Sequence, residues 1–403
     1  MKKFDKILTA LKNKSPLNFL YENGYTPDSV KIEIVTTFRP FFQNPANLDE
    51  YAIKFMVSDW VEFLKLTTFH PDAEALIKQI VAHYNSAKTR DNIAVWTVIN
   101  NLMPLQIDAG NKFWSILKLE LDKSKLEFEE FVQTSMKDIG DMIEGLMKVM
   151  LFENLAIDKI NRGKTVDIEA IKKLELGVIV EDLANNCSYG QIFRVSPENL
   201  KITDWRNISA HQNHKLLPGN KVLCEYGPKE NRRTITVNRQ ELFDRVGKIY
   251  YTLQLLNISH KLFAFDNLKD IIAVNPIPDD SNARDEIGFL SFASSVYSQG
   301  FDIVDINYKK DSDAIMTLRD MTDSNPKSRG IHASQLVYPL WFISESKTST
   351  VIYQKKDGKP FLKAQVTNDT CEKIKSGEQT LDYLAQQVKF ELIKEDGSTQ
   401  TIP

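Results

Sequence analysis

The chain carries, at residues 202–214, the stretch ITDWRNISAHQNH, which predicts a short helix. We expect this helix to run from about Asn199 through His214, with Thr203 or Asp204 capping its N-terminus. A rotation of 100° per residue gives it one apolar and one polar flank. The apolar flank comprises Ile202, Trp205, Ile208 and, at its polar end, Gln212; the polar flank comprises Asn207, His211 and His214. The helix should therefore pack on one side and present a polar stripe on the other.

The polar residues of this stretch suit phosphodiester chemistry. Histidine exchanges protons closest to neutral pH, so His211 can give or take a proton. Arg206 lies about 140° from His211 around the helix, but its long side chain can reach the stripe and match phosphate oxygens. Asn207 can orient the histidine or hold a phosphate oxygen, and the nearby helix N-terminus favours anions. This set requires no metal and no cofactor.

Helices and strands are expected on either side of this stretch. Two amphipathic helical blocks precede it, one from about Leu126 to the polar break at 161–164 and one from Val166 to about Asn186. Two alternating segments follow it, 221–226 and 233–237, and predict a β-hairpin. A long helix is then expected from Arg239 to about Phe265.

The rest of the chain extends this plan to three parts. The first third has apolar residues at helical spacing, and the residues after the proline-containing segment 275–280 mix short strands with helices. We therefore expect a mainly α fold: a helical N-terminal region (1–120), a helical bundle with a β-hairpin insertion (121–266), and a small α+β C-terminal domain (267–403) whose role the sequence leaves open.

The pattern Arg206-Asn207-x-x-x-His211 on a late helix of a small bundle resembles the HEPN superfamily (higher eukaryotes and prokaryotes nucleotide-binding). The resemblance covers roughly Leu121 to Phe265. It implies a homodimer in which two such motifs face each other and form one RNA site. It also implies a metal-independent endoribonuclease, in which the ribose 2′-OH attacks its own phosphate and leaves a 2′,3′-cyclic phosphate.

The resemblance further implies a role for each motif residue. His211 handles the proton, Arg206 stabilises the charged transition state, and Asn207 supports them. An acidic or polar residue on the preceding helix often assists in this family, and Glu181 and Asp182 are the candidates. Many members are toxins or effectors of antiviral defence, so we expect a regulated nuclease whose flanking regions bind a regulatory protein or ligand.

Several other interpretations of the same residues stay open. Arg206 can simply pair with Asp182 or Asp204, and His211 and His214 can be surface residues. The bundle can be a non-catalytic platform for dimerisation or partner binding. The two histidines together with Cys187 or Cys224 can hold zinc, although their spacing fits no usual zinc pattern.

In the C-terminal part, Asp302, Asp305 and Asp311 can serve carboxylate or metal chemistry, although alternating charge on an exposed strand explains them too.

Basic residues near the motif are candidates for RNA contacts. The residues singled out are Arg232, Arg233 and Lys215, with Lys221, Arg239 and Arg245 close in sequence. A solvated hairpin edge explains the same charges without RNA. The net charge of −3 excludes a strongly basic protein that binds long duplexes passively, so any RNA site must be a local patch.

Composition and cysteine usage indicate an ordinary globular protein. The chain has 403 residues, of which 42% are hydrophobic and 26% charged, enough for more than one core. Its three cysteines are far apart and form no CxxC pair, so neither a disulfide framework nor a zinc ribbon is predicted. No apolar run is long enough to span a bilayer and the N-terminus lacks a signal-peptide core, so we expect a cytoplasmic protein without a membrane partner.

Overall fold

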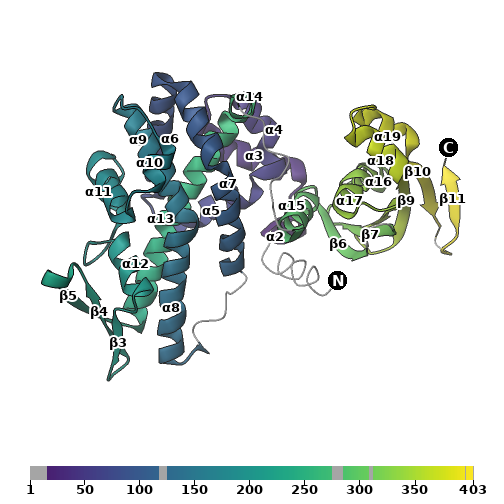
Figure 1. Cartoon of the computed structure of the whole chain (residues 1–403). Helices are drawn as coiled ribbons and strands as arrows, with labels where there is room; N and C mark the ends of the chain where they lie inside the picture. The colour runs from purple at the N-terminus through teal and green to yellow at the C-terminus, as the bar shows by residue number, and fades with distance from the viewer. Residues whose placement is uncertain (1–15, 118–124, 275–284, 308–311, 395, 403) are drawn as a thin grey trace. The chain divides into compact units, whose positions relative to one another are not determined.

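The computed structural model describes residues 16–117, 125–274, 285–307, 312–394 and 396–402 (Figure 1). The chain divides into two compact units. The helical unit comprises Phe38–Asp49 and Asp59–Ala283, and the sheet unit comprises Met1–Thr37, Glu50–Ser58 and Arg284–Pro403. We expected domain boundaries at residues 120–121 and at the proline-containing segment 275–280. Both lie outside the described residues.

The helical unit agrees with the expectation of a mainly α fold. In this unit, α13 packs against both α6 and α8. The helices wholly or partly in this unit are η1 (Arg39–Phe41), α4 (Pro45–Phe55), α5 (Val57–Phe69), α6 (Ala73–Arg90), α7 (Asn92–Leu117), α8 (Phe128–Met142), η3 (Ile143–Met147), α9 (Lys148–Asn161), α10 (Ile168–Lys172), α11 (Leu176–Asn186), η4 (Gly190–Phe193), α12 (Ile202–Ala210), η5 (Lys229–Asn231), α13 (Arg239–Asp266) and α14 (Leu268–Val274).

Helix α9 lies at the centre of this unit, because its residues 149–158 are all buried. Three of these buried residues are polar, and a buried polar group must find partners. Glu153 accepts a hydrogen bond from the Tyr84 hydroxyl at 2.6 Å and lies 2.7 Å from Nδ1 of His260. Asn154 donates to the carbonyl of Met150 and accepts from the Tyr189 hydroxyl at 2.9 Å.

The two helical blocks expected before the motif are each interrupted. Between α8 and α9, residues 143–147 form a π-helical segment, η3, in which Gly145 leaves helical geometry with φ −87° and ψ −119°. The second block is not one helix from 166 to 186 but two, α10 and α11. A π segment changes the direction of side chains relative to a regular helix, so the sequence period alone could not place Glu144.

The predicted β-hairpin is confirmed and has a third strand. Strand β4 (Lys221–Tyr226) pairs antiparallel with β5 (Arg233–Asn238), and β3 (His214–Leu217) pairs antiparallel with β4. The expectation of a helix from 199 through 214 was wrong at both ends. Residues 200–201 form β2, which pairs with β1 (Arg194–Val195), and α12 covers only Ile202–Ala210. Gln212 adopts a φ of 52°, which ends the helix and turns the chain into β3.

The sheet unit is built around a six-stranded mixed sheet with the order β11-β10-β9-β8-β7-β6. Strands β7 and β8 are parallel and the other neighbours are antiparallel. The parallel pair needs a crossover, which α16 and α17 supply. The elements of this unit are α2 (Pro16–Glu22), α3 (Pro27–Phe38), α15 (Asp285–Ser298), β6 (Phe301–Asn307), β7 (Asp313–Asp320), α16 (Pro326–Ser334), α17 (Val337–Ser344), β8 (Thr348–Gln354), β9 (Pro360–Thr367), α18 (Asn368–Lys375), α19 (Leu381–Gln387), β10 (Lys389–Ile393) and β11 (Thr399–Ile402).

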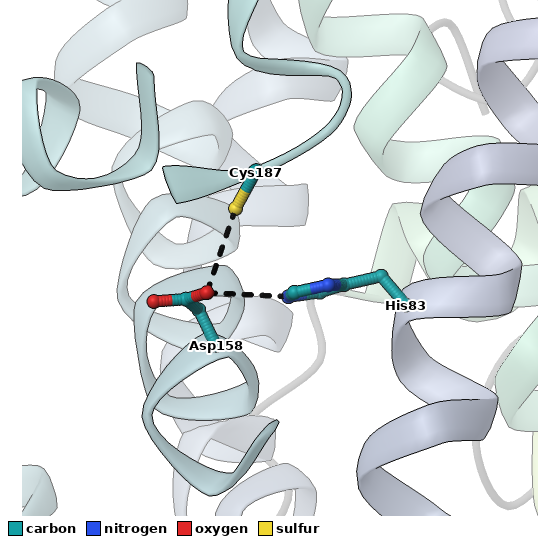
Figure 2. Close-up of side chains that lie close together, drawn as sticks. All are labelled: His83, Asp158 and Cys187. Carbon is teal, nitrogen blue, oxygen red and sulfur yellow. Dashed lines mark hydrogen bonds and ion pairs between the residues drawn. The ribbon is translucent and has the colours of Figure 1, made fainter. Parts of the chain in front are cut away.

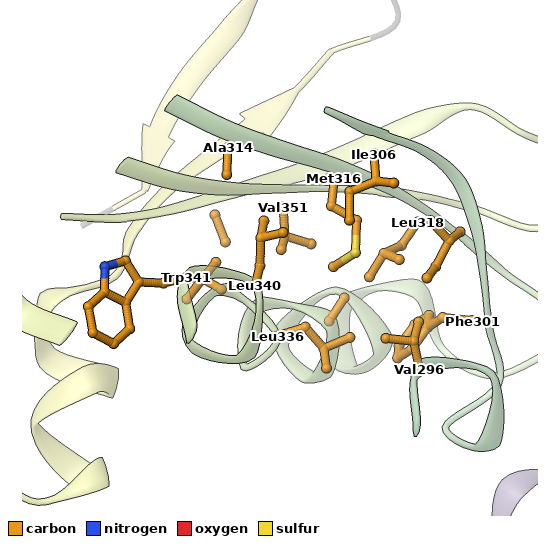
Figure 3. Close-up of a cluster of buried hydrophobic side chains, with 14 of the residues drawn as sticks. Val296, Phe301, Ile306, Ala314, Met316, Leu318, Leu336, Leu340, Trp341 and Val351 are labelled. Carbon is orange, nitrogen blue, oxygen red and sulfur yellow. The ribbon is translucent and has the colours of Figure 1, made fainter. Parts of the chain in front are cut away.

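The core of the sheet unit lies between the sheet and its helices, as Figure 3 shows. Met316, Leu318 and Val351 point from the strands towards Leu336 and Leu340. Alternation along β7 buries every second residue from Ala314 to Asp320. The α+β character expected for the C-terminal region is therefore confirmed. Within the described residues, no helix has the length and apolar character that a membrane crossing requires.

Candidate functional site

Helix α12 is fixed by its apolar flank and by a cap at its first turn. Ile202, Trp205 and Ile208 are fully buried, as their spacing predicts. The cap is not Thr203 or Asp204, as expected from the sequence, because the N-cap residue is Lys201. The backbone N–H of Lys201 donates to the Asp204 carboxylate at 3.1 Å, so Asp204 acts from the third helical position.

Helix α12 packs closely against α8. The Ser209 hydroxyl donates a hydrogen bond of 2.6 Å to the backbone carbonyl of Met136. Gly140 lies opposite, and a Cβ on this glycine would stand only 2.8 Å from Oγ of Ser209. The missing side chain of Gly140 therefore permits the close approach that turns the other side of α12 outward.

Arg206 projects from that outer side and forms an ion pair with Glu144 through its Nε. Its Nη1 also donates to the side-chain oxygen of the adjacent Asn207 at 3.0 Å. Glu144 is bound by Lys148 as well, at 3.0 Å. Burial alone would raise the pKa of Glu144, but hydrogen bonds from Lys148 and Arg206 outweigh it and lower that pKa. Glu144 is thus an ionised partner of Arg206, 62 residues away in sequence.

Glu144 is the site residue that sequence reasoning missed. The alternative in which Arg206 pairs with Asp182 or Asp204 does not describe this structure, because those carboxylates have other partners. No local signal identifies Glu144, since it sits in the π segment where the helical period breaks.

A depression of about 1040 Å³ lies beside Arg206 and Asn207. Its wall comes from η3, the start and body of α11, and the outer side of α12. The charges around it are balanced rather than basic: the cations are Lys148, Lys172, Lys173, Lys201 and Arg206, and the anions are Glu144, Glu175, Glu181, Asp182 and Asp204. A phosphate placed here would therefore compete with carboxylates that already hold several of the cations.

Glu181 and Asp182, the acidic candidates of the preceding helix, both line this depression but do not touch the motif. Glu181 forms an ion pair with Lys201, whose hydrogen bond lowers the pKa of the carboxyl. Asp182 binds the Arg162 guanidinium at 3.1 Å.

His211 lies one turn beyond Asn207, as the C-cap residue of α12. Its backbone N–H donates to the carbonyl of Asn207 at 3.1 Å, and its side chain is exposed. Across the described part of the chain, its imidazole makes no hydrogen bond or ion pair, so both ring nitrogens are available to a ligand. His211 does not belong to the wall of the depression.

The expected polar stripe is only partly formed. Asn207 and His211 keep their i, i+4 relation, whereas His214 leaves the helix and starts β3, where it is half-buried. We also expected His211 to lie near a helix N-terminus, which favours anions, and this prediction was wrong. This residue stands at the C-terminal end of α12.

The basic residues proposed for RNA contacts surround the three-stranded sheet and not the depression. Lys215 on β3 and Arg233 on β5 are exposed, and Arg232 forms an ion pair with Glu225 at 2.6 Å. Two neighbours have structural partners: Arg239 stacks over the ring of Phe131, and the buried Arg245 pairs with Glu198.

The other candidate chemistries find little geometric support among the described residues. Cys224 lies on β4 and is a register partner of His214, but both belong to strands while His211 ends a helix. In the sheet unit, Asp302 accepts a hydrogen bond from Tyr297 at 2.7 Å and pairs with Arg319 at 2.8 Å. Asp305 lies exposed on β6, and Asp311 lies outside the described residues.

Comparisons with known proteins identify no relative. No protein-family model matches this chain, and neither the curated proteins nor the solved structures contain a significant match.

Proposed function

We propose that this protein is a metal-independent endoribonuclease of the HEPN type. The observation that carries the proposal is the outer side of α12: Arg206 and Asn207 are hydrogen-bonded to each other there, and an exposed His211 with a free imidazole follows one turn later. These are a phosphate-binding group, a group that orients it, and a proton carrier, all held on a helix whose opposite flank is fully buried.

Each group has a defined part in the proposed reaction. The ribose 2′-oxygen forms a bond to phosphorus and the bond from phosphorus to the 5′-oxygen breaks, which leaves a 2′,3′-cyclic phosphate and a 5′-hydroxyl. His211 takes the proton of the 2′-OH or delivers one to the leaving oxygen. Arg206 stabilises the charge on the non-bridging oxygens, and Asn207 orients Arg206.

The need for both a base and an acid argues for two copies of the chain. One chain brings a single free histidine to the outer side of α12, whereas the reaction needs one proton acceptor and one proton donor. In a homodimer with the two α12 helices facing each other, the second His211 fills the other role. Lys215 and Arg233 then lie on exposed strands, where they can follow the RNA backbone.

The test is cleavage of single-stranded RNA in the presence of EDTA. Wild type should produce cyclic-phosphate ends, and Arg206→Ala and His211→Ala should each lose at least a hundredfold in rate. Lys137→Ala is the matched control, because Lys137 is also a cation in an ion pair on the same bundle but lies outside the depression. Cleavage that survives His211→Ala would overturn the assignment.

Mixing wild type with the His211→Ala variant tests the composite site. A heterodimer of the two chains carries only one His211, so it lacks either the proton acceptor or the proton donor. RNA cleavage per wild-type chain should therefore fall as His211→Ala chains are added, and an unchanged rate in a mixture shown to contain heterodimers contradicts the composite site.

The second candidate is a non-catalytic partner-binding protein. The observation in its favour is the exposure of Val178 (53%) and Leu174 (38%) at the edge of the depression, since exposed apolar side chains in a cluster often mark an interface. Wild type that forms a dimer and leaves RNA intact in the assay above supports this candidate instead.

A further inference from the structure

Three side chains that can bind a metal converge in the helical unit (Figure 2). They are His83 from α6, Asp158 from α9, and Cys187, the residue that ends α11. Oδ1 of Asp158 stands between the other two, 4.0 Å from Nε2 of His83 and 3.9 Å from Sγ of Cys187. The three donor atoms all lie within 4.8 Å of one another.

The geometry points to a zinc site formed by His83, Asp158 and Cys187. Mixed nitrogen, oxygen and sulfur donors suit Zn²⁺, whereas Mg²⁺ and Ca²⁺ prefer sites made of oxygen alone. Three protein ligands leave the fourth position of a tetrahedron for water. The ion would join α6, α9 and the end of α11 into one cross-linked cluster.

The spacing of the donors is close to what zinc requires. Bonds of about 2.0 to 2.3 Å at tetrahedral angles place ligand atoms roughly 3.3 to 3.6 Å apart. The observed separations of 3.9 Å (Sγ to Oδ1) and 4.0 Å (Nε2 to Oδ1) exceed this by about 0.4 to 0.7 Å, and Nε2 and Sγ lie within 4.8 Å of each other, so side-chain rotations must draw the three donors together around an ion.

One of the three donor atoms lacks a hydrogen-bond partner. Nε2 of His83 is buried and has no hydrogen-bond partner in the described structure. The Cys187 thiol makes a 3.9 Å contact with Asp158 and also a hydrogen bond with Tyr189.

Arg162 is the charge that opposes a cation here, and it is already neutralised. Its Nη2 lies 2.5 Å from Oδ2 of Asp158 and 3.1 Å from Asp182, so it binds the carboxylate oxygen that faces away from His83 and Cys187. Without metal the two carboxylates and Arg162 sum to one negative charge. Binding of Zn²⁺ with loss of the thiol proton (Zn²⁺ + HS–Cys187 → Zn–S–Cys187 + H⁺) brings that sum to zero.

Asn161 contacts the outer ring nitrogen of His83. Its amide nitrogen lies 3.2 Å from Nδ1, and its side-chain oxygen is buried without a partner. A metal bound to Nε2 requires that the proton of the neutral ring sits on Nδ1. If the side-chain amide of Asn161 is turned over, its oxygen can accept a hydrogen bond from this Nδ1–H. The turn breaks the present hydrogen bond from the Asn161 amide nitrogen to the His83 carbonyl.

The experiment measures zinc binding to the whole chain after dialysis against EDTA. Titration with Zn²⁺ alone should give one ion per chain, with the release of one proton, and should raise the melting temperature, whereas Mg²⁺ should do neither. Co²⁺ in place of Zn²⁺ should produce a thiolate-to-cobalt absorption band. No bound zinc, or no such band, overturns the inference.

Variants identify the site by comparison with matched controls. His83→Gln and Cys187→Ser should each weaken Zn²⁺ binding at least tenfold, whereas His70→Gln and Cys224→Ser should bind as wild type does. The chain in which Cys224 and Cys371 are both serine retains Cys187 as its only thiol and should keep the cobalt band. Zinc binding unchanged by Cys187→Ser would place the metal elsewhere. RNA cleavage is independent of this outcome, because it is assayed in EDTA.

Discussion

The ion pair between Arg206 and Glu144 sets how strongly the proposed site can bind phosphate. Both side chains are about one third exposed, and a pair of this kind contributes about 0.5 to 1 kcal/mol. Under the proposed function, RNA would compete with Glu144 for the guanidinium. The carboxylate therefore holds Arg206 in place in the free protein but weakens its attraction for RNA.

We predict that Glu144→Gln strengthens RNA binding about two- to fivefold, because the amide keeps a hydrogen-bond acceptor and removes the competing charge. Binding of 2′-O-methyl RNA, which cannot be cleaved, measures this dissociation constant. Glu74→Gln is the control, since Glu74 pairs with Lys78 on α6 outside the depression. Weaker binding by Glu144→Gln would show that the carboxylate supports the site rather than competing with RNA.

His332 should make the sheet unit sensitive to acid. Its Nδ1 lies 3.4 Å from the Arg329 guanidinium, and its Nε2 lies 2.9 Å from the side-chain oxygen of Gln299. Burial lowers the pKa of His332 and Arg329 lowers it further, against weaker opposite effects of Asp320 and Asp28. As the pH falls below about 6.5, the unfolded chain takes up a proton that the folded chain still refuses, so stability falls.

The corresponding variant is His332→Gln, which cannot be protonated. Its free energy of unfolding should change less than that of wild type between pH 7 and pH 5, as measured by urea titration. His211→Gln, at an exposed position, should leave the pH dependence of the sheet unit as it is in wild type. An equal loss of stability in wild type and His332→Gln would mean that other groups cause the acid sensitivity.

At the level of single residues, the sequence predicted which face of α12 is outward but not what it touches. The burial of Trp205 and Ile208 follows from their spacing, because an apolar flank must pack. Glu144 could not be found in this way, since its position depends on a π segment and on a contact across 62 residues. The departure of His214 from the helix depends on the φ of Gln212, which local propensity does not determine.

At the level of elements, the packing of α12 on α8 depends on one small residue. Gly140→Ala alone places a Cβ 2.8 Å from Oγ of Ser209, and we predict a loss of about 1 kcal/mol in the free energy of unfolding. In a Ser209→Ala background the obstructing oxygen is gone. Gly140→Ala should then stabilise the protein by up to about 1 kcal/mol, because alanine favours the helix.

A double-mutant cycle of these two positions, measured by urea unfolding, tests that change of sign. Additive effects of Gly140→Ala and Ser209→Ala would show that the helices do not meet as closely as the hydrogen bond from Ser209 to Met136 implies.

The elements themselves were predicted with uneven success. The hairpin of β4 and β5 and the long α13 follow from clear alternation and helical spacing. Strand β3 has only four residues, and buried and exposed residues do not alternate along it. It can therefore be recognised only from its pairing with β4 in the structure. Helix α9 is buried on all sides, which removes the amphipathic signal and hides the roles of Glu153 and Asp158.

At the level of the whole molecule, the sheet unit is assembled from segments distant in sequence. Tyr21 of α2 is buried and donates a hydrogen bond of 2.9 Å to the carbonyl of Ser298, which ends α15. The two residues are 277 positions apart. This hydrogen bond therefore joins the N-terminal segment to the C-terminal part of the sheet unit.

We predict that Tyr21→Ala destabilises the sheet unit by about 3 kcal/mol, through the cavity and the lost hydrogen bond, and Tyr21→Phe by about 1 kcal/mol. Hydrogen exchange measured by mass spectrometry should show faster exchange in α15 and β6 but not in α8 and α12. Tyr25→Ala, at a position that is 41% exposed, is the control and should change little. Unchanged exchange in α15 after Tyr21→Ala would show that the N-terminal segment is dispensable for this unit.

The separation of Tyr21 from Ser298 also has a consequence during synthesis on the ribosome. At about 5 to 20 residues per second, the segment around Tyr21 emerges roughly 15 to 55 seconds before α15 has been translated. The helical unit is fully translated once α14 has been made, shortly before α15, whereas Leu17, Tyr21, Val30 and Ile34 remain without the later part of their unit until α15 and the strands follow. Nascent chains of this protein should therefore present an early apolar segment to chaperones, and the sheet unit should acquire its native structure last.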